Sequence, residues 1–258
     1  MNKTVFLFAT HKLTDFVLEQ YYRLKLATKN IGVLYLLIED GELQQIPVDV
    51  KYYSFSVDTL NELNYEPIEE SIIPGSNHFP VLQFYKEHPE FLYYWNIEYD
   101  VYFNGKWESF FDPFEMIISD FISSHIEWYT QRPKWDWWKS VQFETLSIPK
   151  NRYLKSFNPI YRISNRALKA LDGVLSLRNS GHHEVVIPTV LDYLGYTIND
   201  FGGNSEFTLC ELNIPCYLSN SELNNWYTES TMRYRPVFNK EAITRKGIDN
   251  MLYHPIKF

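Results

Sequence analysis

The sequence has little cysteine, no long hydrophobic run and no recognisable leader, and each absence narrows the class of protein. Cys210 and Cys216 are its only cysteines. Two are too few for a disulfide framework, and their spacing matches no common zinc site, so we expect reduced thiols in a cytoplasmic protein. No apolar run approaches the roughly 20 residues that cross a bilayer, and the N-terminus lacks a signal-peptide pattern. We expect no transmembrane segment; peripheral association with the inner face of a membrane is left open.

Concentrated positive charge and glycine-rich phosphate motifs are also missing. The net charge is -8, and the basic residues are scattered rather than gathered in a block. Binding to nucleic acid relies on basic patches that neutralise phosphates, so the sequence predicts no nucleic-acid partner. Neither GxGxxG nor GxxxxGKS occurs. Any bound nucleotide must therefore be held without the dinucleotide-binding turn or the P-loop.

Aromatic residues, in contrast, are abundant. They make up 17% of the chain, with 20 Tyr, 18 Phe and 7 Trp. Their flat apolar faces suit sugar rings and bases, but they fill ordinary hydrophobic cores equally well. The aromatic content by itself shifts the interpretation only slightly toward a protein that contacts carbohydrate.

The first third of the chain alternates short apolar runs with an amphipathic stretch. TVFLFA at residues 4–9 and IGVLYLLIED at residues 31–40 flank a helical pattern, and VKYYSF follows as a third strand. This alternation predicts a wound, mainly parallel α/β sheet with flanking helices. We expect a single domain over residues 1–258, with a nucleotide-binding half at about 1–105 and an acceptor-binding half at about 106–258.

The later segments carry more local signals. Residues 113–131 have a helical pattern, and SNRALKALDGVLSL has a Ser/Asn cap and apolar residues at helical spacing. Asn104-Gly105 is a strong hairpin-turn signal between the strand WNIEYDVYF and the segment KWESFF. HHEVVIPTVLDYLGY predicts a further helix that Pro188 makes imperfect.

Two acids stand inside an apolar strand at WNIEYDV. Glu98 and Asp100 are two residues apart, so on a strand they project from the same face. Adjacent carboxylates raise each other's pKa unless a cation lies between them, and Mg²⁺ or Mn²⁺ is typically held by one or two carboxylates together with substrate phosphates. An exposed, solvated pair on an edge strand is the alternative. The hydrophobic residues on both sides favour a central strand and a metal–diphosphate site.

Three motifs in order resemble the GT-A class of nucleotide-sugar glycosyltransferases, and together they span the chain. WNIEYDVYFNGKW resembles the class's acidic D-x-D triplet at a strand end, with Glu98 and Asp100 in the acidic places. GHHEVVIPTVL resembles its second acidic motif, with Glu184 in the acidic place and Val185 where Asp often stands. LYHPIKF resembles a C-terminal segment that completes the metal site.

The resemblance implies a hexosyl- or N-acetylhexosaminyltransferase that uses Mn²⁺ or Mg²⁺, a nucleotide-sugar donor and a glycan or lipid-linked acceptor. Asp100 and His254 would hold the cation; Glu98 would contribute directly, through water, or at the ribose. Lys257 would lie near the diphosphate, and Glu184 would be the catalytic base.

Other side chains complete the expected donor and acceptor sites. Because ligands of wound sheets collect at the carboxyl ends of strands, the residues expected at the nucleotide are Thr10, His11, Asp40 and Asp58. The residues expected at the acceptor are Trp135, Trp137, Trp138 and His183. A metal-dependent nucleotidyltransferase and a non-catalytic carbohydrate-binding protein are the alternative functions.

Overall fold

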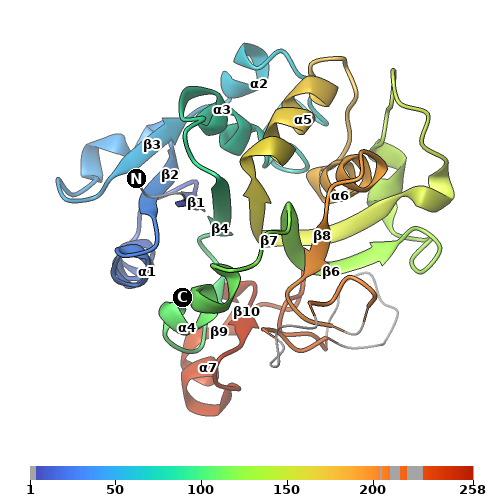
Figure 1. The fold of residues 1–258 in the computed structure, drawn as a ribbon. Coiled ribbons are helices and arrows are strands. Elements are labelled where there is room, and N and C mark those ends of the chain that lie inside the picture. Colours follow the sequence, from blue (N-terminus) through green and yellow to red (C-terminus); the bar gives the residue numbers. More distant parts are fainter. Residues whose placement is uncertain (1–3, 204, 210–215, 220–228, 258) are drawn as a thin grey trace.

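The computed structural model describes residues 4–203, 205–209, 216–219 and 229–257. A seven-stranded sheet with the order β3-β2-β1-β4-β7-β6-β8 crosses the whole molecule (Figure 1). Its strands, in chain order, are β1 (Thr4–Thr10), β2 (Val33–Glu39), β3 (Tyr52–Phe55), β4 (Tyr93–Glu98), β6 (Phe121–Trp128), β7 (Leu154–Ser164) and β8 (Ile198–Asp200). β4, which carries the first acidic residue, is central as predicted.

The sheet is mixed but mostly parallel. β1 pairs in parallel with β2 and β4, and β2 pairs in parallel with β3. β7 is antiparallel to both of its neighbours, β4 and β6, while β6 and β8 are parallel. All strands except β7 therefore run in one direction, and the predicted α/β class with a mainly parallel sheet is confirmed.

Helices cover both faces of this sheet (Figure 1). The helices are α1 (Asp15–Thr28), α2 (Thr59–Glu62), α3 (Phe79–Glu87), α4 (Trp107–Phe111), α5 (Asn165–Leu175), α6 (His183–Tyr193) and α7 (Lys240–Lys246). α3, α5 and α6 pack into one hydrophobic core, and α1 and α4 pack into another on the opposite face. This three-layer arrangement explains why the strand sequences are nearly continuous apolar runs rather than alternating ones.

Strand β1 shows how one run serves both cores. Val5 and Leu7 belong to the core beneath α3, α5 and α6, whereas Phe6 and Phe8 belong to the core beneath α1 and α4. All four are almost completely buried. Successive side chains of a strand point to opposite faces, so a central strand of a three-layer fold needs apolar residues at every position.

Local capping fixes where the helices begin. Thr14 accepts a hydrogen bond from the backbone N–H of Val17 at the start of α1, and Ser164 accepts one from Ala167 at the start of α5. Each cap satisfies a backbone donor that the first helical turn leaves free. The Ser cap predicted for the second of these helices is therefore present.

Two local predictions were wrong. The expected helix at residues 113–131 contains β6 instead, because this segment pairs with β7 on one side and β8 on the other. Asn104-Gly105 does not form the hairpin expected before KWESFF: residues 107–111 of that segment are α4. The short strand β5 (Tyr102–Phe103) pairs antiparallel with β10 (Leu252–Tyr253), which is remote in sequence. Tertiary pairing outweighed the local signal in both places.

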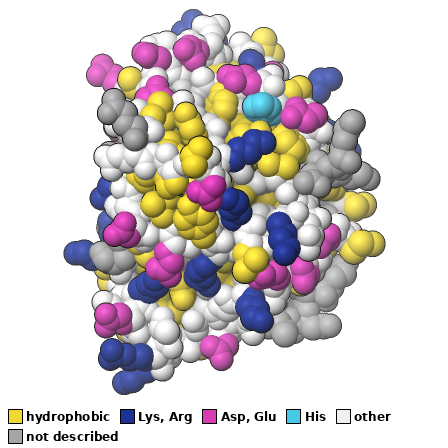
Figure 2. Space-filling model, turned by 90° about the vertical axis from the view of Figure 1, so that its left-hand side faces the viewer, with side chains coloured by type: hydrophobic (Ala, Val, Ile, Leu, Met, Phe, Trp, Pro, Cys, Tyr) yellow, Lys and Arg dark blue, Asp and Glu magenta, His cyan; other side chains and the backbone are white. Residues whose placement is uncertain are grey.

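The last residues of the chain return to the carboxyl ends of the sheet. β11 (Ile256–Lys257) pairs in parallel with β9 (Phe238–Asn239), next to the β5–β10 pair. Within the described part of the chain, no helix is long and apolar enough to cross a membrane. Cys216 has a free thiol, and Cys210 lies outside the described residues. On the face drawn in Figure 2, apolar side chains gather in the upper half, and basic and acidic side chains lie around them and over the lower half.

Candidate active site

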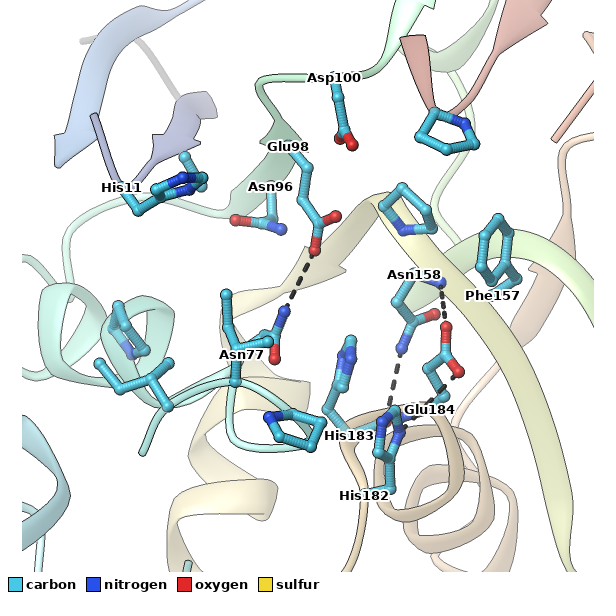
Figure 3. Close-up of a pocket in the computed structure, with 18 of the residues that line it drawn as sticks. His11, Asn77, Asn96, Glu98, Asp100, Phe157, Asn158, His182, His183 and Glu184 are labelled. Carbon is cyan, nitrogen blue, oxygen red and sulfur yellow. Dashed lines mark hydrogen bonds and ion pairs between the residues drawn. The ribbon is translucent and has the colours of Figure 1, made fainter. Parts of the chain in front are cut away.

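A cavity of about 840 Å³ opens at the carboxyl ends of β1, β2, β3 and β4. Its other walls are the loop before α3, the segment at residues 135–137, the middle of β7, the first residues of α6, and residues 234–235 and 254–255. A volume of this size suits a cofactor-sized or nucleotide-sized ligand. Figure 3 shows Glu98 and Asp100 on one side of the cavity and Glu184 on the other.

The acidic pair reaches the cavity through a turn rather than along one strand. β4 ends at Glu98, which lies opposite Ala9 of β1. The Tyr99 N–H then donates to the Ala9 carbonyl, and the Val101 N–H donates to the Glu98 carbonyl, which closes a turn around Asp100. The predicted juxtaposition of the two carboxylates therefore exists, but the continuous strand through Asp100 does not.

His254 reaches the same point from the other end of the sequence. The backbone N–H of His254 donates to the Thr231 carbonyl, and the backbone N–H of Ile256 donates to the Asp100 carbonyl. These backbone hydrogen bonds hold the C-terminal segment against the turn. The imidazole Nε2 lies 3.4 Å from Asp100 Oδ1 and 3.9 Å from Glu98 Oε2. One ligand atom from each of Glu98, Asp100 and His254 lies within 4.8 Å of the others.

The electrostatics of this trio favour a cation. Burial and, after it, the neighbouring Asp100 raise the pKa of Glu98 to about 7. Burial by itself lowers the pKa of His254, but the two carboxylates outweigh it and raise that pKa. The imidazole Nδ1 lies 2.9 Å from the Arg233 carbonyl. An Nδ1–H donated to that carbonyl leaves the Nε2 lone pair facing the carboxylates, the tautomer typical of metal-bound histidine.

Two carboxylates and an imidazole therefore fit a divalent cation such as Mn²⁺ or Mg²⁺. Oxygen ligands suit both ions, and the imidazole adds a ligand that Mn²⁺ accepts more readily than Mg²⁺ does.

Glu184 occupies the first turn of α6. Its backbone N–H donates to His182 Nδ1, which caps the helix. Its Oε1 accepts the Asn158 N–H of β7 at 3.3 Å, and its Oε2 lies 3.8 Å from His182 Nδ1. The helix N-terminus favours the carboxylate, yet burial raises the pKa of Glu184 to about 7. This is the range in which a carboxylate both accepts and releases a proton near neutral pH.

A buried cation stands near this acid. Lys155 on β7 lines the cavity and is only 1% exposed. Its Nζ lies 3.7 Å from Glu127, whose carboxylate Arg132 also binds with two hydrogen bonds. Lys155 and Arg132 together carry one more charge than Glu127 neutralises, which leaves one net positive charge in this group. That charge lowers the pKa of Glu184 against the effect of burial.

An aromatic wall lies beside Glu184. Trp137 stacks on His182 with 4.3 Å between ring centroids and an interplanar angle of 25°. Trp135 meets the same imidazole edge-on, at 6.2 Å. Both tryptophans line the cavity, and Asp136 between them also lines it. A flat indole next to a carboxylate can stack on a sugar ring and bind its hydroxyl groups.

Most of the residues expected at the site line this cavity. They are Thr10, His11, Glu98, Asp100, Trp135, Trp137, His183, Glu184 and His254. They come from both ends and the middle of the chain, and the fold brings them together. His11 at the end of β1 meets the Tyr99 ring edge-to-face at 5.1 Å.

Four expected residues do not line it. β2 ends at Glu39, one residue earlier than expected, and Asp40 begins a 3₁₀ turn. β3 ends at Phe55 as expected, and Asp58 precedes α2; Glu39 and Val57 line the cavity in place of the two aspartates. Trp138 is buried behind the wall, where its indole N–H donates to the Arg132 carbonyl.

The fourth residue, Lys257, lies at a separate groove. β11 pairs with β9 there, and the groove also contains Phe16, Glu19 and Lys240. His254 and Pro255 line the cavity. The next residue, Ile256, packs into a small core and so separates them from Lys257.

The lining residues that were not predicted include Asn77, Asn96 and Lys155. A signal existed for Asn96, which lies two residues before Glu98 and so shares its face of the strand. Asn77 and Lys155 carry no comparable signal, because loop geometry brings the first to the cavity and the unpredicted pairing of β7 brings the second.

Comparison with known proteins gives limited guidance. Residues 53–120 match a family described as "Protein of unknown function (DUF3405)". No curated protein matches the sequence.

Several solved structures are similar at low identity. A glycosyltransferase involved in the glycosylation of the major capsid of PBCV-1 is 13% identical with a TM-score of 0.38, covering 78% of this chain and 84% of that chain. Glucosyl-3-phosphoglycerate synthase from Mycobacterium tuberculosis, in complex with Mg²⁺ and UDP, is 12% identical with a TM-score of 0.45, covering 77% and 68%. The inositol-1-phosphate CTP transferase from T. maritima is 10% identical with a TM-score of 0.41, covering 83% and 92%. Any function must therefore be argued from the site itself.

Proposed function

We propose that this protein is a metal-dependent glycosyltransferase that moves a sugar from a nucleoside-diphosphate sugar to a hydroxyl group of a glycan or lipid-linked acceptor. The observation that carries the proposal is the placement of two different acidic centres in one cavity. Glu98, Asp100 and His254 form a cation-binding trio, and Glu184 is a separate buried carboxyl with a pKa of about 7.

In this proposal each part of the donor has its own place in the cavity. The nucleoside lies between Thr10, His11 and the ends of β2 and β3, where Phe55 offers an apolar face. The diphosphate lies at Asp100 and His254, with Arg235 at the rim of the same cavity. The nearby Arg233 is engaged elsewhere, with its Nε donating to the Pro236 carbonyl.

The acceptor lies on the Glu184 side. Trp137 presents a ring for stacking, and Glu184 is positioned to take the proton of the attacking hydroxyl group. The acceptor oxygen then forms a bond to the anomeric carbon as the bond from that carbon to the phosphate oxygen breaks. The nucleoside diphosphate leaves with the bonding electron pair, and a direct displacement inverts the anomeric centre. The bound cation supplies charge stabilisation for the leaving diphosphate.

A thermal-shift screen tests the proposal. Nucleoside diphosphates and nucleotide sugars are added to the full chain with and without Mn²⁺, since a ligand that binds the folded state raises its melting temperature. We expect a shift that requires both nucleotide and metal, followed by release of nucleoside diphosphate when an acceptor is present. Absence of any metal-linked shift in a folded sample contradicts the proposal. A shift with nucleoside triphosphates together with release of pyrophosphate identifies a nucleotidyltransferase instead.

A further inference from the structure

Buried polar atoms without hydrogen-bond partners are concentrated at one wall of the cavity. In the described part of the chain, nine buried side-chain nitrogen or oxygen atoms have no partner. Five of them belong to just four residues: Asn77, His78, Asn96 and His183. Each unpaired buried polar group costs free energy and is rare in native proteins. Three of the five atoms belong to residues that line the cavity: Asn77 Oδ1, Asn96 Oδ1 and His183 Nδ1. Their concentration in one place indicates that a bound molecule completes these three missing hydrogen bonds.

These residues come from three segments that meet between the two acidic centres. Asn96 lies on β4, Asn77 and His78 lie at the start of α3, and His183 opens α6. Asn77, Asn96 and His183 line the cavity, and His78 stacks behind His183 with ring centroids 6.2 Å apart. Figure 3 shows Asn77 and Asn96 beside Glu98, and His183 between Asn77 and Glu184.

The orientation of the Asn77 side-chain amide shows which hydrogen-bonding group is missing at this wall. Asn77 Nδ2 donates to Glu98 Oε1 at 3.3 Å, so its Oδ1 is the atom left unpaired. An amide oxygen only accepts hydrogen bonds, so its missing partner is a donor such as a hydroxyl group.

The neighbouring imidazoles are neutral at physiological pH. Burial lowers the pKa of His183 to about 3, and it lowers the pKa of His78 as well. A neutral imidazole presents one donor and one acceptor nitrogen. Amides and neutral imidazoles together form a surface that suits groups which both donate and accept, as sugar hydroxyls do.

The charges around the wall disfavour an anionic ligand group. Glu98 stands at one end and Glu184 at the other. Among the described residues that line the cavity, the cationic side chains are Lys155 and Arg235. Lys155 already faces Glu127 at 3.7 Å, and Arg235 is exposed at the rim, where its charge acts on Tyr99. A third carboxylate placed between the two acids would be repelled by both.

We propose that Asn77, Asn96 and His183 bind the hydroxyl groups of the transferred sugar, and that this sugar is uncharged, a hexose or N-acetylhexosamine rather than a hexuronic acid. The proposal rests on the proposed function, because it assumes a nucleotide-sugar donor with its diphosphate at Asp100 and His254. In it, His183 contacts the donor sugar and not, as the sequence predicted, the acceptor.

Asn96→Leu tests the role of the wall. Leucine has a similar volume and removes a buried polar group that has no partner, so we expect the free protein to melt at the same temperature or higher. Binding of the nucleoside diphosphate with Mn²⁺ should stay unchanged, while affinity for the corresponding nucleotide sugar should fall about tenfold or more. Asn30→Leu, at an exposed position outside the cavity, is the matched control.

A second comparison tests the class of sugar. Donors are paired by nucleotide, UDP-glucose with UDP-glucuronate and GDP-mannose with GDP-mannuronate, and titrated against the wild-type protein with Mn²⁺. We expect the neutral member of the productive pair to bind about tenfold more tightly. Equal or tighter binding of the uronate overturns the proposal, as does an Asn96→Leu variant that keeps full affinity for the sugar. If the wild-type protein shows no metal-dependent binding of any nucleoside diphosphate, the result instead contradicts the proposed function, and the sugar assignment with it.

Discussion

Glu98 and Glu184 are alike in one respect and opposite in another. Each is a cavity-lining carboxyl whose burial raises its pKa to about 7. Glu98 has a second acid, Asp100, beside it and an imidazole facing both. Glu184 lies at a helix start, with a backbone N–H, His182 and a nearby buried cation around it. The same residue type is thus placed in two different electrostatic settings.

The difference indicates different chemistry. A pair of neighbouring carboxylates concentrates negative charge at one point, and a divalent cation that the facing histidine also binds relieves it. A single buried carboxyl held by one backbone N–H and opposed by a lysine keeps a proton that exchanges near neutral pH. The four predictions below separate the two settings, from the largest expected effect to the smallest.

Glu184→Gln should have the largest effect. Glutamine keeps the size and the hydrogen-bond acceptor but cannot take a proton, so we expect transfer to fall by about 10²–10⁴-fold. Nucleotide and metal binding, measured by thermal shift, should be unchanged because the trio is intact. Full transfer activity in this variant would remove Glu184 as the base.

Asp100→Asn should weaken cation binding at Glu98, Asp100 and His254. Removal of one charged ligand weakens the cation site, so we expect the apparent affinity for Mn²⁺ and for nucleoside diphosphate to fall on the order of 10–100-fold. Titration calorimetry measures both. Asp58→Asn, an exposed carboxylate outside the cavity, is the matched control and should bind as the wild type does. Unchanged metal affinity in Asp100→Asn would argue against the trio as the metal site.

Lys155→Met should shift the pH dependence of transfer. The general base must be ionised, so activity should rise with pH through the pKa of Glu184, near 7. Loss of the buried cation raises that pKa, and the acid limb of the profile should move up by about one pH unit. Lys139→Met, at an exposed residue, controls for the substitution itself. A profile that stays in place would show that Lys155 does not act on the base.

The smallest effect concerns stability without metal or ligand. Glu184 binds its proton with a pKa of about 7 when folded and with its ordinary value of 4.5 when unfolded. Between these values the folded state binds more protons, so its contribution to the free energy of unfolding falls as the pH rises.

Glu184→Gln should therefore be more stable than the wild type at pH 8, by on the order of 2 kcal/mol, and no different below pH 4. Melting curves in chelator at both pH values test this, with exposed Glu115→Gln as control. Equal stability at pH 8 would contradict the raised pKa.

The sequence predicted the architecture better than its details. The apolar runs at β1, β2 and β3 and the capped helix α5 were recognisable, because patterning and capping are local properties. β6 was misread as a helix and Asn104-Gly105 as a hairpin, because both segments take their structure from strands that are remote in sequence, β7 and β10.

The candidate site follows the same rule. The acidic pair, Glu184 and His254 were all proposed from short motifs, and the fold brings all of them to one cavity. Asp40 and Asp58 were misplaced, because β2 ends one residue before Asp40 and Asp58 lies beyond the end of β3, directly before α2. Asn77 and Lys155 were missed because no local pattern marks a residue that a loop or a distant strand delivers.

The sequence alone determined the α/β class and the residue types available for chemistry, since hydrophobic periodicity and motif spacing are written into short segments. Only the tertiary structure decided that His254 lies 3.4 Å from Asp100. It also placed Glu184 apart from Glu98, Asp100 and His254 and left polar groups of Asn77, Asn96 and His183 without partners. Those relations depend on backbone pairing between segments far apart in the chain, and burial then sets the pKa values of the side chains that the pairing brings together.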